Sequence, residues 1–123
     1  MNTEPKSCLL IGYQRFRNLK DIIHILLKND IRNIYISLDI PKNINHEYQS
    51  NYNDFITYLK EIQSKYGDRV IFRKTKKNIG CAVNILSSIE WFFQSENSGY
   101  IFEDDCIPTE KFFTFVICFL DAS

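Results

Sequence analysis

Three consecutive carboxylates, Glu103, Asp104 and Asp105, directly follow the short apolar segment 100–102. A strand over 100–102 would fix the place of these side chains, and adjacent carboxylates repel one another unless a cation lies between them. Mg²⁺ and Mn²⁺ prefer carboxylate, phosphate and water oxygens as ligands. The triplet therefore predicts a seat for a divalent metal and a diphosphate. The alternative is that Asp104 or Asp105 caps the helix that follows.

A basic loop precedes the third predicted helix. Its cations are Arg69, Arg73, Lys74, Lys76 and Lys77. The loop continues through Asn78 and Gly80 into a helix N-terminus, where backbone N–H groups and the helix dipole favour an anion. Arg15, after the first predicted strand, adds a planar donor for phosphate oxygens. The alternatives are a solvated loop and a surface arginine.

Asp39 ends the second predicted strand, where an acidic residue can accept hydrogen bonds from a base or a ribose, or simply begin a turn. The sequence has neither a GxGxxG motif after the first strand nor a P-loop motif, which excludes the usual dinucleotide and P-loop interpretations. His24 and His46 have no neighbours that suggest nucleophilic catalysis, and we interpret both as structural or surface residues.

Short apolar strands alternate with amphipathic helices along the chain. The strands are expected at 7–12, 34–38, 70–72 and 100–102, the helices at 19–27 (capped by Asn18), 52–66, 82–93 and 109–120, and a polar loop at 41–51. This alternation predicts an α/β fold, a three-layer α/β/α sandwich with a mostly parallel sheet. In such sheets ligands bind beyond the carboxyl ends of the strands, where the polar groups described above are expected to lie.

Composition narrows the class of protein. The 123 residues carry 15 basic and 15 acidic side chains, and this neutrality argues against a nucleic-acid binder. The four cysteines show no metal-ligand or CxxC spacing, so we expect reduced thiols that are buried or half-buried. The N-terminus lacks the features of a signal peptide and the longest apolar stretch is too short for a membrane span. We therefore expect a cytoplasmic protein formed from one domain, residues 1–123.

Four sequence segments resemble the nucleotide-diphospho-sugar transferases of GT-A fold. They are residues 78–84 (Asn-Ile-Gly-Cys-Ala-Val-Asn), 89–93 (Ile-Glu-Trp-Phe-Phe), 100–108 (Tyr-Ile-Phe-Glu-Asp-Asp-Cys-Ile-Pro) and 112–113 (Phe-Phe). The resemblance is strongest to bacterial hemolytic or hemolysin-like glycosyltransferases, and the Glu-Asp-Asp motif is also similar to that of the N-acetylglucosaminyltransferase I group. Residues 9–15 add weaker support.

The resemblance implies a metal-dependent glycosyltransferase whose donor is a nucleotide diphosphate sugar, with a UDP-sugar favoured. Asp105 would be the ligand of a divalent cation, Mn²⁺ or Mg²⁺, in a variant of the family's DxD motif. The remaining residues that match donor-binding positions of the family are Arg15, Asp39, Asn78, Gly80, Asn84, Glu103 and Asp104. Asp39 would read the base and Arg15 would meet the phosphates.

A GT-A domain is usually longer than this chain, with its acceptor site and catalytic base after the metal motif. The resemblance therefore covers the N-terminal, donor-binding half of the fold, and we expect a truncated domain. The alternative is a non-catalytic module that binds nucleotide sugar or self-associates. The apolar circumference of the predicted last helix, 112–120, suggests a homodimer formed through that helix.

Overall fold

The computed structural model describes residues 6–104 and 118–119. Its strands are β1 (Ser7–Gly12), β2 (Asn33–Leu38), β3 (Val70–Lys74), β4 (Ser98–Glu103) and β5 (Cys118–Phe119). Its helices are α1 (Phe16–Lys28), α2 (His46–Tyr66) and α3 (Cys81–Phe93), with a 3₁₀ turn at Gly67–Arg69. Strands and helices alternate up to β4, as the apolar periodicity predicts.

The strands form one sheet in the order β3-β2-β1-β4-β5. The pairs β1–β2, β2–β3 and β1–β4 are parallel, and β5 joins β4 antiparallel. The chain moves outward from β1 to β3 and then returns to the other side of β1 with β4. The strand order therefore reverses between β1 and β4, which is the position where open α/β sheets bind ligands.

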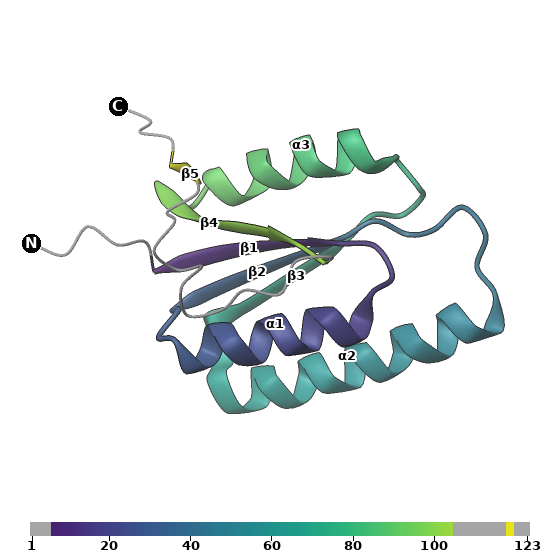
Figure 1. Ribbon diagram of the computed structural model, residues 1–123, viewed down its shortest axis with the longest axis horizontal. Coiled ribbons are helices and arrows are strands. Elements are labelled where there is room, and N and C mark those ends of the chain that lie inside the picture. The colour runs from purple at the N-terminus through teal and green to yellow at the C-terminus, as the bar shows by residue number, and fades with distance from the viewer. Residues whose placement is uncertain (1–5, 105–117, 120–123) are drawn as a thin grey trace, which may run out of the picture.

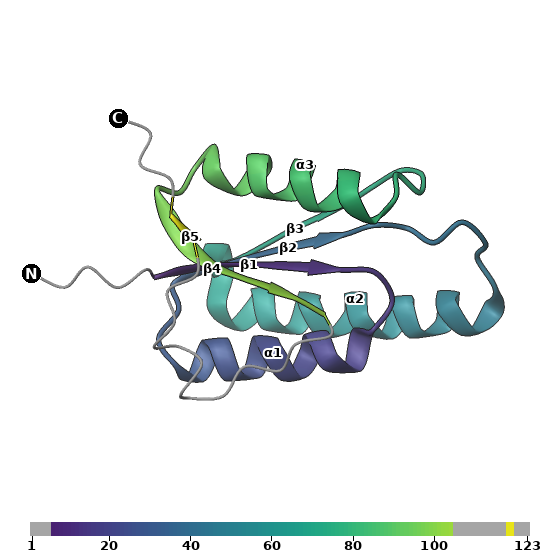
Figure 2. The ribbon, with the colours of Figure 1, turned by 45° about the horizontal axis from the view of Figure 1, so that its top comes forward.

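Helices cover both faces of this sheet, as Figures 1 and 2 show: α1 and α2 lie on one face and α3 on the other. One buried cluster joins α1 and α2 to the sheet and includes Phe16, Phe55 and Phe102. A smaller cluster under α3 includes Leu9, Ile11 and Phe92. The fold is thus the expected three-layer α/β/α arrangement, and α3 stands alone on its face among the described helices.

Three local expectations are wrong. Arg15, rather than Asn18, is the N-cap of α1, and Asn18 lies inside the first turn. The second helix begins at His46, because the side chain of Asn45 accepts a hydrogen bond from Tyr48 N, a standard N-cap contact. Residues 46–51 are therefore helical, although they were expected to belong to a loop.

The prediction of a last helix over 109–120 is also wrong at residues 118–119, the part of it that the structure describes. Cys118 and Phe119 form β5, which pairs with Ser98 and Gly99 of β4. A short apolar run rich in aromatic and β-branched residues has no periodicity that separates strand from helix, so the tertiary pairing decides. The rest of that expected helix, its dimer contact and Asp105 lie outside the described residues. Within the described part, no helix is long and apolar enough to cross a membrane.

Candidate functional site

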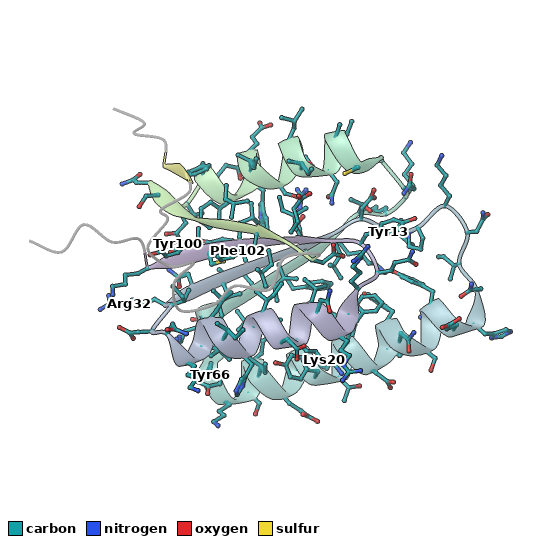
Figure 3. All side chains as sticks on the ribbon, viewed as in Figure 1. Tyr13, Lys20, Arg32, Tyr66, Tyr100 and Phe102 are labelled. Carbon is teal, nitrogen blue, oxygen red and sulfur yellow. The ribbon has the colours of Figure 1, made fainter. Side chains whose placement is uncertain are left out.

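One pocket lies at the carboxyl ends of β1, β2 and β4, against the first turn of α3. Its volume is about 580 Å³. The residues that line it are Ile11, Gly12, Tyr13, Gln14, Arg15, Asp39, Lys42, Asn78, Gly80, Cys81, Asn84, Ile85, Glu103 and Asp104. Figure 3 shows Tyr13 at this end of the sheet and Arg32 at the opposite end. The pocket therefore occupies the point where the strand order reverses.

All seven donor-binding residues expected from the sequence line this pocket. They are Arg15, Asp39, Asn78, Gly80, Asn84, Glu103 and Asp104. They come from four separate stretches of the chain, which the parallel strands bring to one edge of the sheet. The expected metal ligand, Asp105, follows Asp104 and is outside the described residues, so the structure says nothing of its position.

The carboxylate of Asp39 holds the loop that leads into α3. It is 3% exposed. Its Oδ1 accepts hydrogen bonds from Thr75 Oγ1 at 2.8 Å and Ile79 N at 3.1 Å. Its Oδ2 accepts from Asn78 Nδ2 at 3.3 Å and Gly80 N at 3.2 Å. A carboxylate has about four acceptor positions, so the protein itself fills those of Asp39.

Asp104 fixes the loop between β1 and α1. Its Oδ2 accepts a hydrogen bond from Tyr13 N at 2.9 Å and a longer one from Arg15 N at 3.4 Å. Its backbone N donates to Ile11 O, and its carbonyl accepts from Asn18 Nδ2 at 3.0 Å. These contacts join β4 to the start of α1 across the pocket floor. Asn18 therefore ties the helix to β4 instead of capping it.

The first turn of α3 presents hydrogen-bond donors to the pocket. Gly80, its N-cap, has φ of 88°, a conformation that favours glycine. Gly80 has no side chain to cap the helix, and the first turn contains no acidic residue. The carboxylate of Asp39, from the end of β2, accepts the hydrogen bond of Gly80 N instead. The first intrahelical bond is Asn84 N to Gly80 O, so the N–H groups of residues 81–83 are the orphan donors of this helix start.

Five charged side chains line the pocket, and three of them are exposed to solvent: Arg15, Lys42 and Glu103. Within residues 6–104, none of them forms a salt bridge. The two cations and the donors of α3 suit an anion, whereas Glu103 is an oxygen ligand suited to a cation. The described residues contain no group of three or more metal-ligating side chains.

The basic loop does not line the pocket, contrary to expectation. Arg69 lies at the opposite end of the sheet, where it donates to the carbonyls of Ile31 and Arg32. Lys74 lies over the Tyr52 ring, 4.2 Å from its centroid. The physical reason is the place of β3: it lies at the edge of the sheet, two strands from β1, and Arg69 precedes its amino end. Only the end of the loop, Asn78 and Gly80, returns to it.

Sequence reasoning missed several pocket residues. Tyr13 and Gln14 belong to the loop after β1, and Lys42 follows β2 by four residues, so their positions after strands were the available signal. Cys81 was expected to be a buried or half-buried thiol, but it is exposed at the first position of α3. Its place directly after Gly80 at a helix start was the signal for this residue.

Tyr48 is buried near two pocket residues, Tyr13 and Asp39, and does not act as an acid or base at neutral pH. Burial, followed by the nearby Tyr52, Tyr13 and Asp39, raises the pKa of Tyr48 to about 12. Its hydroxyl is buried and has no hydrogen-bond partner within the described residues. The phenol therefore stays neutral and packs against the rings of Phe16 and Tyr52.

No protein-family model matches the sequence, and no curated protein matches it in a sequence search. One solved structure with a similar arrangement is an α,α-trehalose-phosphate synthase (UDP-forming) from Burkholderia xenovorans in complex with glucose-6-phosphate. It is 12% identical with a TM-score of 0.46, and the match covers 79% of this chain and 22% of that chain. This chain therefore spans under a quarter of that structure's length, and so distant a likeness carries no functional argument.

Proposed function

We propose that the chain is the donor-binding part of a metal-dependent glycosyltransferase of GT-A type that uses a nucleotide diphosphate sugar. This proposal is supported by the pocket where the strand order reverses, because the seven residues predicted from the sequence to bind the donor all line it. Its volume of about 580 Å³ lies in the range of pockets that bind small molecules and cofactors.

The diphosphate would lie against the start of α3. There the orphan N–H groups and the helix dipole favour negative charge, and Arg15 and Lys42 add two cations. Arginine can meet phosphate oxygens with two parallel hydrogen bonds. The base and ribose would then lie toward Tyr13 and Gln14, on the loop that Asp104 holds in place.

The divalent ion, Mn²⁺ or Mg²⁺, would be held by Asp105 with help from Glu103. Carboxylate oxygens are hard ligands that fit these ions, and Glu103 is exposed at the mouth of the pocket. When bound, the ion would neutralise charge that develops on the leaving diphosphate. Asp104 is less suited to be a ligand, since its Oδ2 already accepts hydrogen bonds from the β1–α1 loop.

Arg15→Ala is expected to weaken UDP binding by about tenfold or more, the loss expected when a charge-assisted hydrogen bond is removed. Arg17→Ala is the matched control, because Arg17 is exposed on the same helix and does not line the pocket. Calorimetric titration with UDP, with and without Mn²⁺, measures both variants. In Asp105→Ala, UDP binding should no longer depend on Mn²⁺, and UDP binding in the absence of Mn²⁺ should be unchanged. Absence of UDP binding to the wild type, or equal effects of the two arginine variants, would refute the proposal.

Cys81 provides an independent measure of occupancy. It is exposed and lines the pocket, whereas Cys8 is fully buried, and burial raises the pKa of its thiol. We expect N-ethylmaleimide to label Cys81 in the native protein and to leave Cys8 unmodified. UDP at ten times its dissociation constant should slow labelling about tenfold, because only the free pocket reacts. Mass spectrometry of the peptide containing Cys81 gives the rate, and an unchanged rate with bound UDP would place the ligand elsewhere.

The second candidate is a module that binds nucleotide sugar without transferring it. Two of the pocket carboxylates, Asp39 and Asp104, accept hydrogen bonds from backbone N–H groups and so hold loops in place. Their structural role favours this second candidate, because these carboxylates are then not free for catalysis. UDP release from a UDP-sugar, measured with and without candidate acceptors, separates the two functions. Binding without release would favour the non-catalytic module.

A further inference from the structure

A buried polar network connects the sheet to α3 beneath the pocket. Arg73 of β3 donates from Nε to Ser37 Oγ at 2.8 Å and from Nη2 to Ser87 Oγ at 2.7 Å and Ser88 Oγ at 3.3 Å. The Ser37 and Ser88 hydroxyls are 2.7 Å apart, and Ser88 Oγ is 3.4 Å from Asn84 Oδ1. Ser37 and Ser88 are fully buried and Asn84 is 4% exposed. The network thus runs without a break from a cation to a residue that lines the pocket.

The cation of this network has no carboxylate partner. Within the described part of the chain the one salt bridge joins Lys6 to Asp30, far from Arg73 in the sequence. The Arg73 guanidinium lies over the Trp91 ring, 5.2 Å from its centroid, and partial burial lowers its pKa. Arginine nevertheless remains charged at physiological pH. Arg73 is only partly buried, so its charge loses part of its hydration without gaining a counter-charge, which is unfavourable.

The guanidinium limits how the hydroxyl groups of the network can be oriented. Arginine only donates hydrogen bonds, so each serine oxygen near it accepts, and the hydroxyl protons turn away. The Ser88 hydroxyl has one proton and two acceptors within reach, Ser37 Oγ and Asn84 Oδ1. When Ser37 donates to Ser88, that proton is free to meet Asn84 Oδ1, and every hydroxyl of the network then has an acceptor. The Asn84 carbonyl oxygen is then turned inward. Its amide nitrogen, which has no partner within residues 6–104, is left for the pocket.

We propose that Arg73 and Ser88 are positioning residues that hold the Asn84 amide with its N–H donors toward the pocket, and so make this part of the pocket select an anion rich in acceptor oxygens. The inference rests on the proposed function, which supplies that anion as the diphosphate of the nucleotide sugar. Asn84 N–H groups and the orphan N–H groups of the first turn of α3 then present donors alone. An amide turned the other way would present an acceptor and repel phosphate oxygens.

Two serine variants on one helix test this inference. Ser88→Ala removes the hydroxyl that meets Asn84, whereas Ser87→Ala removes a hydroxyl that also accepts from Arg73 but does not contact the Asn84 side chain. We expect Ser88→Ala to weaken pyrophosphate and UDP binding by about fivefold and Ser87→Ala by less than about twofold, the range of a neutral hydrogen bond. In an Asn84→Ala background, Ser88→Ala should have no further effect, since the two residues act through one group.

Inorganic pyrophosphate separates failure of the inference from failure of the proposed function. Calorimetry measures affinity, and the ¹⁵N-labelled side-chain amide signals of Asn84 should shift on addition of pyrophosphate to the wild type and to Ser87→Ala. Pyrophosphate binding with the expected pattern but no UDP binding would refute the nucleotide-sugar function and support the inference. Equal losses in the two serine variants, an additive effect in the Asn84→Ala background, or no pyrophosphate binding to the wild type would overturn the inference.

Discussion

Asp39→Ala is expected to lower the free energy of unfolding by about 2–4 kcal/mol and to weaken UDP binding by more than tenfold. The variant removes the acceptor of two backbone N–H groups, at Ile79 and Gly80, and of two side-chain donors. Water can replace part of this network, so the loss is smaller than the sum of the four bonds. Urea unfolding followed by circular dichroism measures stability, and calorimetry measures binding.

Asp39→Asn distinguishes a positioning role from direct contact with a ligand. The amide keeps one acceptor oxygen but turns a donor toward one of the donating groups, so we expect about half of the stability loss of the alanine variant. If Asp39 instead reads the base, as the family resemblance implies, both variants should keep the unfolding free energy of the wild type and lose binding alone. That outcome would contradict the positioning role.

Gly99→Ala is expected to destabilise the protein by about 2–3 kcal/mol, the cost of overpacking a filled core. A Cβ at this position would lie 2.3 Å from Phe92 Cζ, 2.6 Å from Phe92 Cε2 and 3.0 Å from Ser7 O. Phe92 is fully buried and packs edge-on against Tyr35, with ring centroids 4.9 Å apart. The ring cannot move away freely, so α3 must shift. Urea unfolding with an unchanged m value reports the loss.

A second-site change tests the cause of this effect. Phe92→Leu alone leaves space above the strand and should lower the free energy of unfolding. In the Gly99→Ala background the same change should lower it less, because the added methyl group fills part of that space. Strictly additive effects would show that Gly99 matters for another reason. If Gly99→Ala were as stable as the wild type, the Phe92 ring would be able to move aside at little cost, which would contradict its tight packing.

Much of the fold could be predicted because its signals are local. Four apolar runs and three amphipathic periods correspond to β1 to β4 and α1 to α3, and Gly67 ends α2 as expected. The start of α2 could not be predicted from apolar spacing, since its first turn is polar apart from Tyr48, and the cap at Asn45 was the better signal. The pairing of Cys118 and Phe119 with β4 depends on tertiary contact and has no local pattern.

Seven of the fourteen residues that line the pocket could be predicted, because parallel strands bring their carboxyl ends to one edge. The strand ends identified Arg15, Asp39, Glu103 and Asp104, whatever ligand they face. What each side chain does could not be predicted, because it depends on partners far away in the sequence. Asp39 meets the loop forty residues later, and the carboxylate of Asp104 meets Tyr13. The network from Arg73 to Asn84 depends in the same way on the packing of α3 over β2 and β3.

The central place of β1 has a consequence for how the chain folds. Its partner β2 follows after a single helix, but its other partner, β4, closes a contact from Asp104 to Tyr13 that spans 91 residues. Such distant contacts form slowly because a long loop must close first. A chain emerging from the ribosome can therefore assemble β1 to β3 with α1 and α2 while one edge of β1 stays unpaired. That edge is open to other strands, and the pocket forms only when β4 covers it.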